Sequence, residues 1–327
     1  MKKIIINSLI QLVLIYLIIE FVILDDLSQE SFALLLFPNI FYLFLFIIFI
    51  KFFASYIFFL IINLVSNIKN NFISVSSIIL QGGVINQIIP GVGYIFNYYK
   101  LKSNSNNSLI EYSISQSIFS IGNVLAYFVL ALISGFIYFS RLTIIFNKTN
   151  LIILTIIFFF FFLYIFIFRK KIYSITKKNF LKIRILENTF NELKIVKDNI
   201  FKDLYKFLFI FICIIIKSIF ECIAFYIALR MFGADISFMA SNYTWIISSL
   251  AMSILLINYF GLFELALVIS STFLIPEFDD MTLFALSFKA LTLVALVAAT
   301  IIALFLSIIF NLKSNNIQKR INRIRLK

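Results

Sequence analysis

Residues 81–94 read QGGVINQIIPGVGY and contain four of the chain's eight glycines and one of its three prolines. The sequence on either side reads as almost uninterrupted membrane helix. Glycine and proline interrupt the helical hydrogen-bond ladder. Non-helical backbone at membrane depth is tolerated only where protein or a water-filled cavity satisfies the freed N–H and C=O groups. The stretch therefore predicts a broken or re-entrant helix that lines a site.

The composition indicates a polytopic membrane protein built of helices. The chain has 327 residues, of which 62% are hydrophobic and 13% are charged, and its mean hydropathy is +1.06. Several apolar runs reach about 20 residues, which is long enough to span a bilayer. We therefore expect one integral membrane domain of the all-α class over residues 1–327, with no soluble domain.

The apolar sequence divides into eight blocks. They cover residues 4–24, 32–63, 72–99, 109–139, 151–168, 204–232, 238–275 and 283–310. Block 32–63 is longer than a bilayer requires, so it forms either one long tilted helix or a span with an interfacial extension.

Charged turns between the blocks predict the topology, because short loops rich in lysine and arginine stay in the cytoplasm. The basic segments expected inside are Lys2 and Lys3, Lys69, Lys100 and Lys102, the loop 169–206 and the tail 313–327. The acidic turns 25–30 and 277–280 are expected outside. Blocks 72–99 and 238–275 must then each begin and end on one side, which makes each a hairpin, and the other six blocks cross the bilayer.

The two hairpins divide the chain into two similar halves. The first hairpin is expected to break at Gly82, Gly83, Pro90, Gly91 and Gly93, and the second near residues 258–261. The first half, residues 1–140, then has the order crossing, crossing, hairpin, crossing. The second half, residues 150–312, repeats that order from the opposite side. Such an inverted-topology repeat places substrate near mid-membrane, between the halves.

Five charged residues fall inside apolar blocks, namely Lys51, Lys217, Glu221, Glu264 and Lys289. A charge at the centre of a membrane helix costs about 2.5 to 3.5 kcal/mol, so each of them needs a partner or a wet cavity. Lys217 and Glu221 are four residues apart on one helix face, which predicts an intramembrane ion pair with either a structural or a transport role.

Glu264 lies beside the second break and has two possible roles. It either fixes the interrupted backbone by accepting from exposed N–H groups, or it faces Lys289 across a polar cavity. In the second case we expect Asn86 and the Pro90–Gly91 turn on the opposite wall of that cavity.

Two further basic segments suit a membrane surface. Lys100 and Lys102 follow several tyrosines, which is typical of lipid-phosphate contacts or of an ordinary interfacial anchor. Loop 169–206 carries apolar residues at helical spacing among its lysines and arginines. It is expected to lie on the cytoplasmic face and bind anionic lipid, or to serve as a solvated linker or partner-binding helix.

Soluble-type catalysis is not expected. The chain has no histidine, no P-loop and no paired metal-ligand spacing. Cys213 and Cys222 are too far apart along one helix to form a disulfide within it. We expect no catalytic residue, no metal, no cofactor and no nucleic-acid partner.

At its two breaks the chain resembles the lysylphosphatidylglycerol synthase transmembrane (flippase-like) family. The first half of the resemblance is Asn86-Gln-Ile-Ile-Pro90-Gly91-Val92-Gly93, followed by Lys100 and Lys102. The second is Gly233 before a polar turn, then Gly261-Leu-Phe-Glu264-Leu-Ala-Leu and Lys289 in the last span. The order and spacing extend over nearly the whole chain, with no aminoacyl-transferase domain appended.

The resemblance implies a membrane domain that binds or translocates lipid. The residues implied are Asn86, Pro90, Gly91, Gly93, Lys100, Lys102, Gly261, Glu264 and Lys289. The ligand is expected to be an anionic phospholipid or a polyprenyl-phosphate glycolipid, moved between the leaflets of a prokaryotic inner membrane, with both termini cytoplasmic. The alternative is a non-transporting accessory subunit of a membrane glycosyltransferase or lipid-modifying enzyme. An enzyme acting on lipid phosphate is disfavoured, because no histidine or repeated acidic motif would activate a nucleophile or hold a metal.

Overall fold

The structure is a computed structural model that describes residues 39–139, 203–255, 267–268 and 281–325, apart from Asn67, Pro90 and Asn106. Side chains are described over residues 39–134, 203–250, 267–268 and 281–310. Several expected features lie outside the described residues: the crossings 4–24 and 151–168, both acidic turns, loop residues 169–202, Pro90, and the second break with Gly261 and Glu264.

Every regular element in the described part of the chain is a helix, as the composition predicted. The helices are α3 (Asn39–Val65), α4 (Phe72–Ile88), α5 (Val92–Ser105), α6 (Leu109–Phe139), α9 (Leu204–Met231), α10 (Phe238–Leu255) and α12 (Met281–Arg325).

Four of these helices are long and apolar enough to cross a membrane. They are α3, α9, residues Leu109–Ser134 of α6 and residues Met281–Phe310 of α12, with lengths of 27, 28, 26 and 30 residues. The described residues thus show a helical membrane protein with four candidate crossings, and the other two of the six expected crossings, 4–24 and 151–168, lie outside those residues. In the region of the expected block 32–63, α3 forms one continuous helix from Asn39 that ends at Val65.

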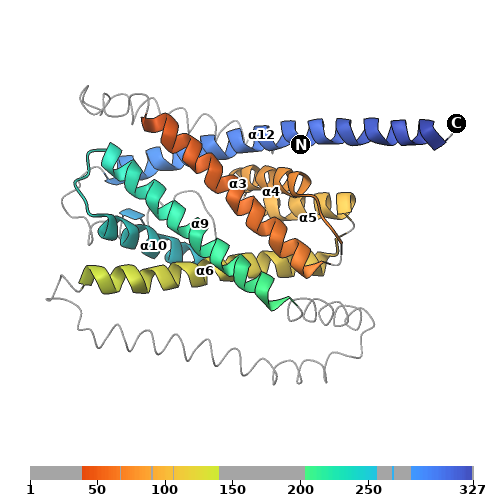
Figure 1. Cartoon of the computed structure of the whole chain (residues 1–327). Coiled ribbons are helices and arrows are strands. Elements are labelled where there is room, and N and C mark those ends of the chain that lie inside the picture. Colours follow the sequence, from red (N-terminus) through yellow and green to blue (C-terminus); the bar gives the residue numbers. More distant parts are fainter. Residues whose placement is uncertain are drawn as a thin grey trace, which may run out of the picture.

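The long helices run in two opposite directions. Figure 1 shows α3 and α12 running toward one end of the bundle, and α6 and α9 running the opposite way. Helix α3 packs against α9, α12, α6 and α4, while α4 also packs on α12 and α10 packs on α6 and α9. The short helices α4, α5 and α10 are therefore held against long helices.

The α4–α5 hairpin has the predicted turn but not all of the predicted breaks. Helix α4 ends at Ile88, and Gly91 has a φ of +86°, which glycine adopts without strain. In contrast, Gly82 and Gly83 lie within continuous helix, so the prediction of a break there was wrong. These two glycines serve helix packing instead. Lipid is as apolar as the side chains, so helix pairs in a membrane are held together by close packing and hydrogen bonds.

Small residues supply that close packing. A Cβ on Gly93 would collide with the carbonyl oxygen of Gly82 and come within 2.7 Å of the Asn86 Cβ. Gly122 of α6 similarly receives the side chain of Ile214 from α9, at 2.5 Å from a built Cβ.

Hydrogen bonds join and terminate the helices. Ser55 of α3 donates to Ser76 of α4 at 3.0 Å in a buried pair. Helix α6 begins with a reciprocal capping box. The Glu111 N–H donates to Ser108 Oγ at 3.1 Å, and the Ser108 N–H donates to Glu111 Oε2 at 2.8 Å. Both bonds satisfy N–H groups that the first helical turn leaves unpaired.

Helix α9 ends in a Schellman motif. Gly233 has a φ of +82°, the Ala234 N–H donates to the Leu229 carbonyl at 3.1 Å, and the Gly233 N–H donates to the Arg230 carbonyl at 3.2 Å. The glycine that precedes the expected polar turn is therefore a helix stop, and α10 starts five residues later at Phe238.

Helix α10 is the first arm of the expected 238–275 hairpin and ends at Leu255. At the other end of the chain, α12 continues to Arg325, so the tail expected from residue 313 is largely an extension of the last span.

An aromatic core fixes α12 against α9. Phe225 is fully buried and packs edge-on against Phe284 and Phe288, with ring centroids 5.5 and 5.7 Å apart. Trp245 of α10 joins this cluster, with its ring centroid 5.1 Å from that of Phe225. The cluster holds α12 in register at Lys289, the residue that follows Phe288.

Candidate functional site

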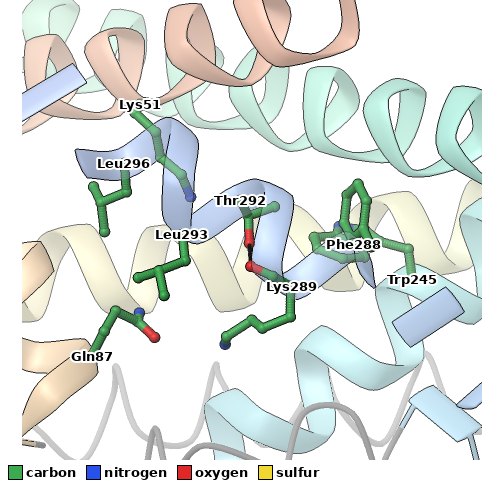
Figure 2. A pocket seen from close by; sticks show the side chains of 8 residues that line it. All are labelled: Lys51, Gln87, Trp245, Phe288, Lys289, Thr292, Leu293 and Leu296. Carbon is green, nitrogen blue, oxygen red and sulfur yellow. Dashed lines mark hydrogen bonds between the residues drawn. The ribbon is translucent and has the colours of Figure 1, made fainter. Parts of the chain in front are cut away.

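A cavity of about 170 Å³ lies between α3, α10, α12 and the end of α4. Its described lining consists of Lys51, Gln87, Trp245, Phe288, Lys289, Thr292, Leu293 and Leu296. Figure 2 shows the Lys51, Gln87 and Lys289 side chains reaching toward this space from three different helices. The remaining lining side chains are mostly apolar or aromatic.

The cavity lies beside the middle of α3. Lys51 is residue 13 of the 27 in α3, which puts it about 18 Å from one end and about 21 Å from the other at ~1.5 Å per residue. Gln87 comes one residue before the end of α4. The tip of the α4–α5 hairpin therefore reaches the depth of the Lys51 side chain.

Two ammonium groups line the cavity, and no described lining residue is a carboxylate. Lys217 and Lys289 both repel the charge of Lys51, while Glu221 of α9 attracts it from outside the cavity. The Gln87 amide can both donate and accept, and Thr292 uses its hydroxyl hydrogen on the Lys289 carbonyl, at 2.8 Å (Figure 2). The charge of the cavity wall therefore suits an anion.

The ion pair predicted between Lys217 and Glu221 is present, with 2.9 Å between Nζ and Oε1. Lys217 also donates to Asn123 Oδ1 at 3.0 Å, and Tyr127 donates to Glu221 Oε2 at 2.5 Å. A further hydrogen bond links Tyr127 to Ser249 of α10. The pair is thus embedded in a network that joins α9 to α6 and α10.

The other described first-half residues implied by the resemblance lie outside the cavity lining and make contacts within the α4–α5 hairpin. Asn86 accepts from the Gly91 N–H at 2.6 Å and so closes the hairpin turn, and Gly93 packs against the opposite arm. Lys100 and Lys102 are exposed on α5, each 5.8 Å from a ring centroid, that of Phe96 and that of Tyr98 respectively. None of these residues is in the cavity lining.

Lys289 is the predicted site residue that does line the cavity. The pairing expected between Glu264 and Lys289 falls on a residue outside the described ranges. Lys51 was expected only as an intramembrane charge. Gln87 and Trp245 were not expected at the site at all, although Gln87 is the polar residue next to Asn86 and Trp245 is the chain's single tryptophan.

Metal binding receives no support from the described residues, which contain no group of three His, Cys, Asp or Glu side chains able to hold an ion.

The chain was compared with protein-family models, curated proteins and solved structures, and none of them matches it.

Proposed function

We propose that this chain is a flippase-like membrane protein that binds an anionic lipid and moves it between leaflets. The observation that carries this proposal is that Lys51, near the middle of the apolar helix α3, and Lys289 line one cavity beside the tip of the α4–α5 hairpin. An anion placed between the two ammonium groups replaces their mutual repulsion with two attractions, which are strong because the surroundings are poorly polarisable.

The size of the cavity favours a headgroup over a whole lipid. A volume of about 170 Å³ accommodates a small polar group, whereas acyl chains of an ordinary phospholipid require far more space. The acyl chains would stay in the bilayer while the phosphate enters the cavity. The Gln87 amide adds a neutral donor that can bind a phosphate oxygen.

The helix packing supports an inverted repeat, in which α3, α4 and α6 correspond to α9, α10 and α12. Exchanging the halves turns the α4–α12 contact into the α10–α6 contact, α3–α12 into α9–α6, and α3–α4 into α9–α10, and all of these contacts occur. The α3–α9 contact maps onto itself. The α3–α6 contact has a looser counterpart, because the backbones of α9 and α12 lie farther apart and these two helices meet through the aromatic side chains of Phe225, Phe284 and Phe288. Two halves of this kind can rock about a site at their interface.

The expected family and location follow as parts of the same proposal. A re-entrant hairpin with an Asn-x-x-x-Pro-Gly turn supports a distant relationship with the lysylphosphatidylglycerol synthase membrane domain. The proposed location is a prokaryotic inner membrane, with six crossings, two hairpins and both termini in the cytoplasm. Lys69, Lys100 and Lys102 then face the cytoplasm, and the turn at Gly233 faces outward.

Lipid scrambling in reconstituted vesicles tests the proposal. Vesicles containing the purified chain and a fluorescent phosphatidylglycerol in both leaflets are treated with a membrane-impermeant reductant. We expect loss of fluorescence to proceed beyond the outer leaflet, and to do so less with fluorescent phosphatidylcholine. No scrambling of either lipid, together with retained binding of phosphatidylglycerol, would favour the accessory subunit instead.

A further inference from the structure

Lys51 and Lys217 occupy matching places in the two halves. Lys51 is residue 13 of the 27 in α3, and Lys217 is residue 14 of the 28 in α9. These two helices correspond in the proposed repeat and pack against each other in opposite directions (Figure 1). Lys51 lines a cavity with α12, while Lys217 contacts α6, which is the counterpart of α12.

The two lysines differ in whether a described carboxylate lies beside the ammonium group. Lys51 faces a cavity with no described carboxylate in its wall. Lys217 is 6% exposed and is neutralised by Glu221, whose other oxygen accepts from Tyr127. The Glu221 carboxylate therefore receives an ammonium group and a hydroxyl group from two helices. A bound anion would require donors of this kind.

We propose that the second half contains an anion site equivalent to the one at Lys51, and that Glu221 fills it from within the chain. The donors of this site are the Lys217 ammonium and the Tyr127 hydroxyl, and its ligand class is a monovalent carboxylate or a phosphate oxygen. The inference rests on the inverted repeat proposed above but does not require lipid transport.

Removing the carboxylate tests the inference, because it empties the second site. Glu221→Ala deletes the carboxylate and leaves space beside Lys217, and formate has the size and charge to replace it. At formate concentrations about fivefold above its dissociation constant, binding to the folded state should raise the Tm of the variant by roughly 1–2 °C. The unmodified chain, whose site is filled, should show no such shift. Formamide, which is similar in shape but uncharged, should have no effect on either protein.

The double variant Lys217→Met with Glu221→Ala is the matched control, since it lacks both charges. It should fold and should not respond to formate. Equal formate shifts in Glu221→Ala and in the double variant would overturn the inference. If Glu221→Ala can be purified only when formate is present, the inference is supported. If it fails with and without formate while the double variant folds, the inference is wrong.

The formate experiment and the lipid proposal can be tested independently, because they depend on different residues. Formate rescue involves Lys217, whereas lipid binding is assigned to Lys51 and Lys289. Absence of rescue, with lipid binding still lost in Lys51→Met, would remove the second site and leave the proposed function intact.

Discussion

Gly82 and Gly93 meet across the α4–α5 hairpin so closely that a methyl group on Gly93 would collide with the Gly82 carbonyl oxygen. This contact keeps the two arms together and places Gln87 at the tip, where it lines the cavity. The glycines therefore position the site from a distance, through backbone contact rather than through a break in the helix.

Gly93→Ala should destabilise the hairpin, because a backbone oxygen cannot move aside as a flexible side chain can. We expect a loss of roughly 1–3 kcal/mol, as for other overpacked sites, measured as a lower Tm in detergent. Gly83→Ala is the matched control. Its new methyl group would lie at an ordinary 3.5 Å from Leu296 and should leave Tm nearly unchanged.

Asn86→Ala should loosen the hairpin turn. The Asn86 side chain accepts from the Gly91 N–H at 2.6 Å, and losing a bond of this type costs about 0.5–1.5 kcal/mol. Asn86→Asp keeps the acceptor oxygen and should retain most of the stability. Thermal unfolding of both variants checks this, and equal losses from the two would show that the acceptor is not what matters.

Lys217 and Glu221 should behave as a strongly non-additive pair. Replacing one partner leaves a charge inside the bundle and is expected to cost roughly 3–5 kcal/mol. Replacing both with methionine should cost much less, because no uncompensated charge remains. A double-mutant cycle on thermal or denaturant unfolding gives the coupling energy, and strictly additive losses would contradict the buried network.

Gly122→Ala should destabilise the protein mildly, and a second substitution at Ile214 should restore the lost stability. A Cβ at this position would lie 2.5 Å from Ile214 Cδ1, the far end of a flexible side chain. Ile214→Val removes that terminal methyl group, so the double variant should recover stability relative to Gly122→Ala alone. The comparison requires only the Tm values of the two single variants and the double variant.

The topology can be read by thiol labelling without removing the native cysteines, since Cys213 and Cys222 are both buried. Lys69→Cys and Lys100→Cys should react from the same side of oriented vesicles, and Asp235→Cys from the opposite side. Labelling of positions 69 and 100 from different sides would mean that α4 and α5 together cross the bilayer once and do not form a hairpin.

The sequence predicted those parts of the fold in which a residue pattern has only one structural interpretation. Long apolar runs predicted the helices, and the i, i+4 spacing predicted the Lys217–Glu221 pair. Proline and glycine next to each other predicted the turn that Gly91 makes with its positive φ. The Ser108-x-x-Glu111 pattern is typical of a capping box, and it marks the start of α6.

The remaining features depend on contacts between distant segments. A glycine inside an apolar run is compatible with a break or with close helix packing, and only the position of α5 shows that Gly82 and Gly93 serve packing. Likewise, Lys51 and Lys289 are 238 positions apart in the chain, and nothing local brings them to one cavity. Lys100 and Lys102 follow the hairpin in sequence, yet α5 carries them away from its tip.

Trp245 provides the most direct test of the central claim, because the chain's single tryptophan lines the cavity between Lys51 and Lys289. Short-chain phosphatidylglycerol is titrated into the protein in an uncharged detergent while Trp245 emission is recorded. Phosphatidylcholine of the same chain length is the comparison lipid, and Lys206→Met, at an exposed ion pair with Asp203, is the control variant. We predict a saturable change with phosphatidylglycerol only, unaltered in Lys206→Met. In Lys51→Met and in Lys289→Met the Kd should rise roughly 10- to 100-fold, the equivalent of one charged hydrogen bond. Equal responses to the two lipids, or unchanged binding in both cavity variants, would contradict an anionic-headgroup site in this cavity.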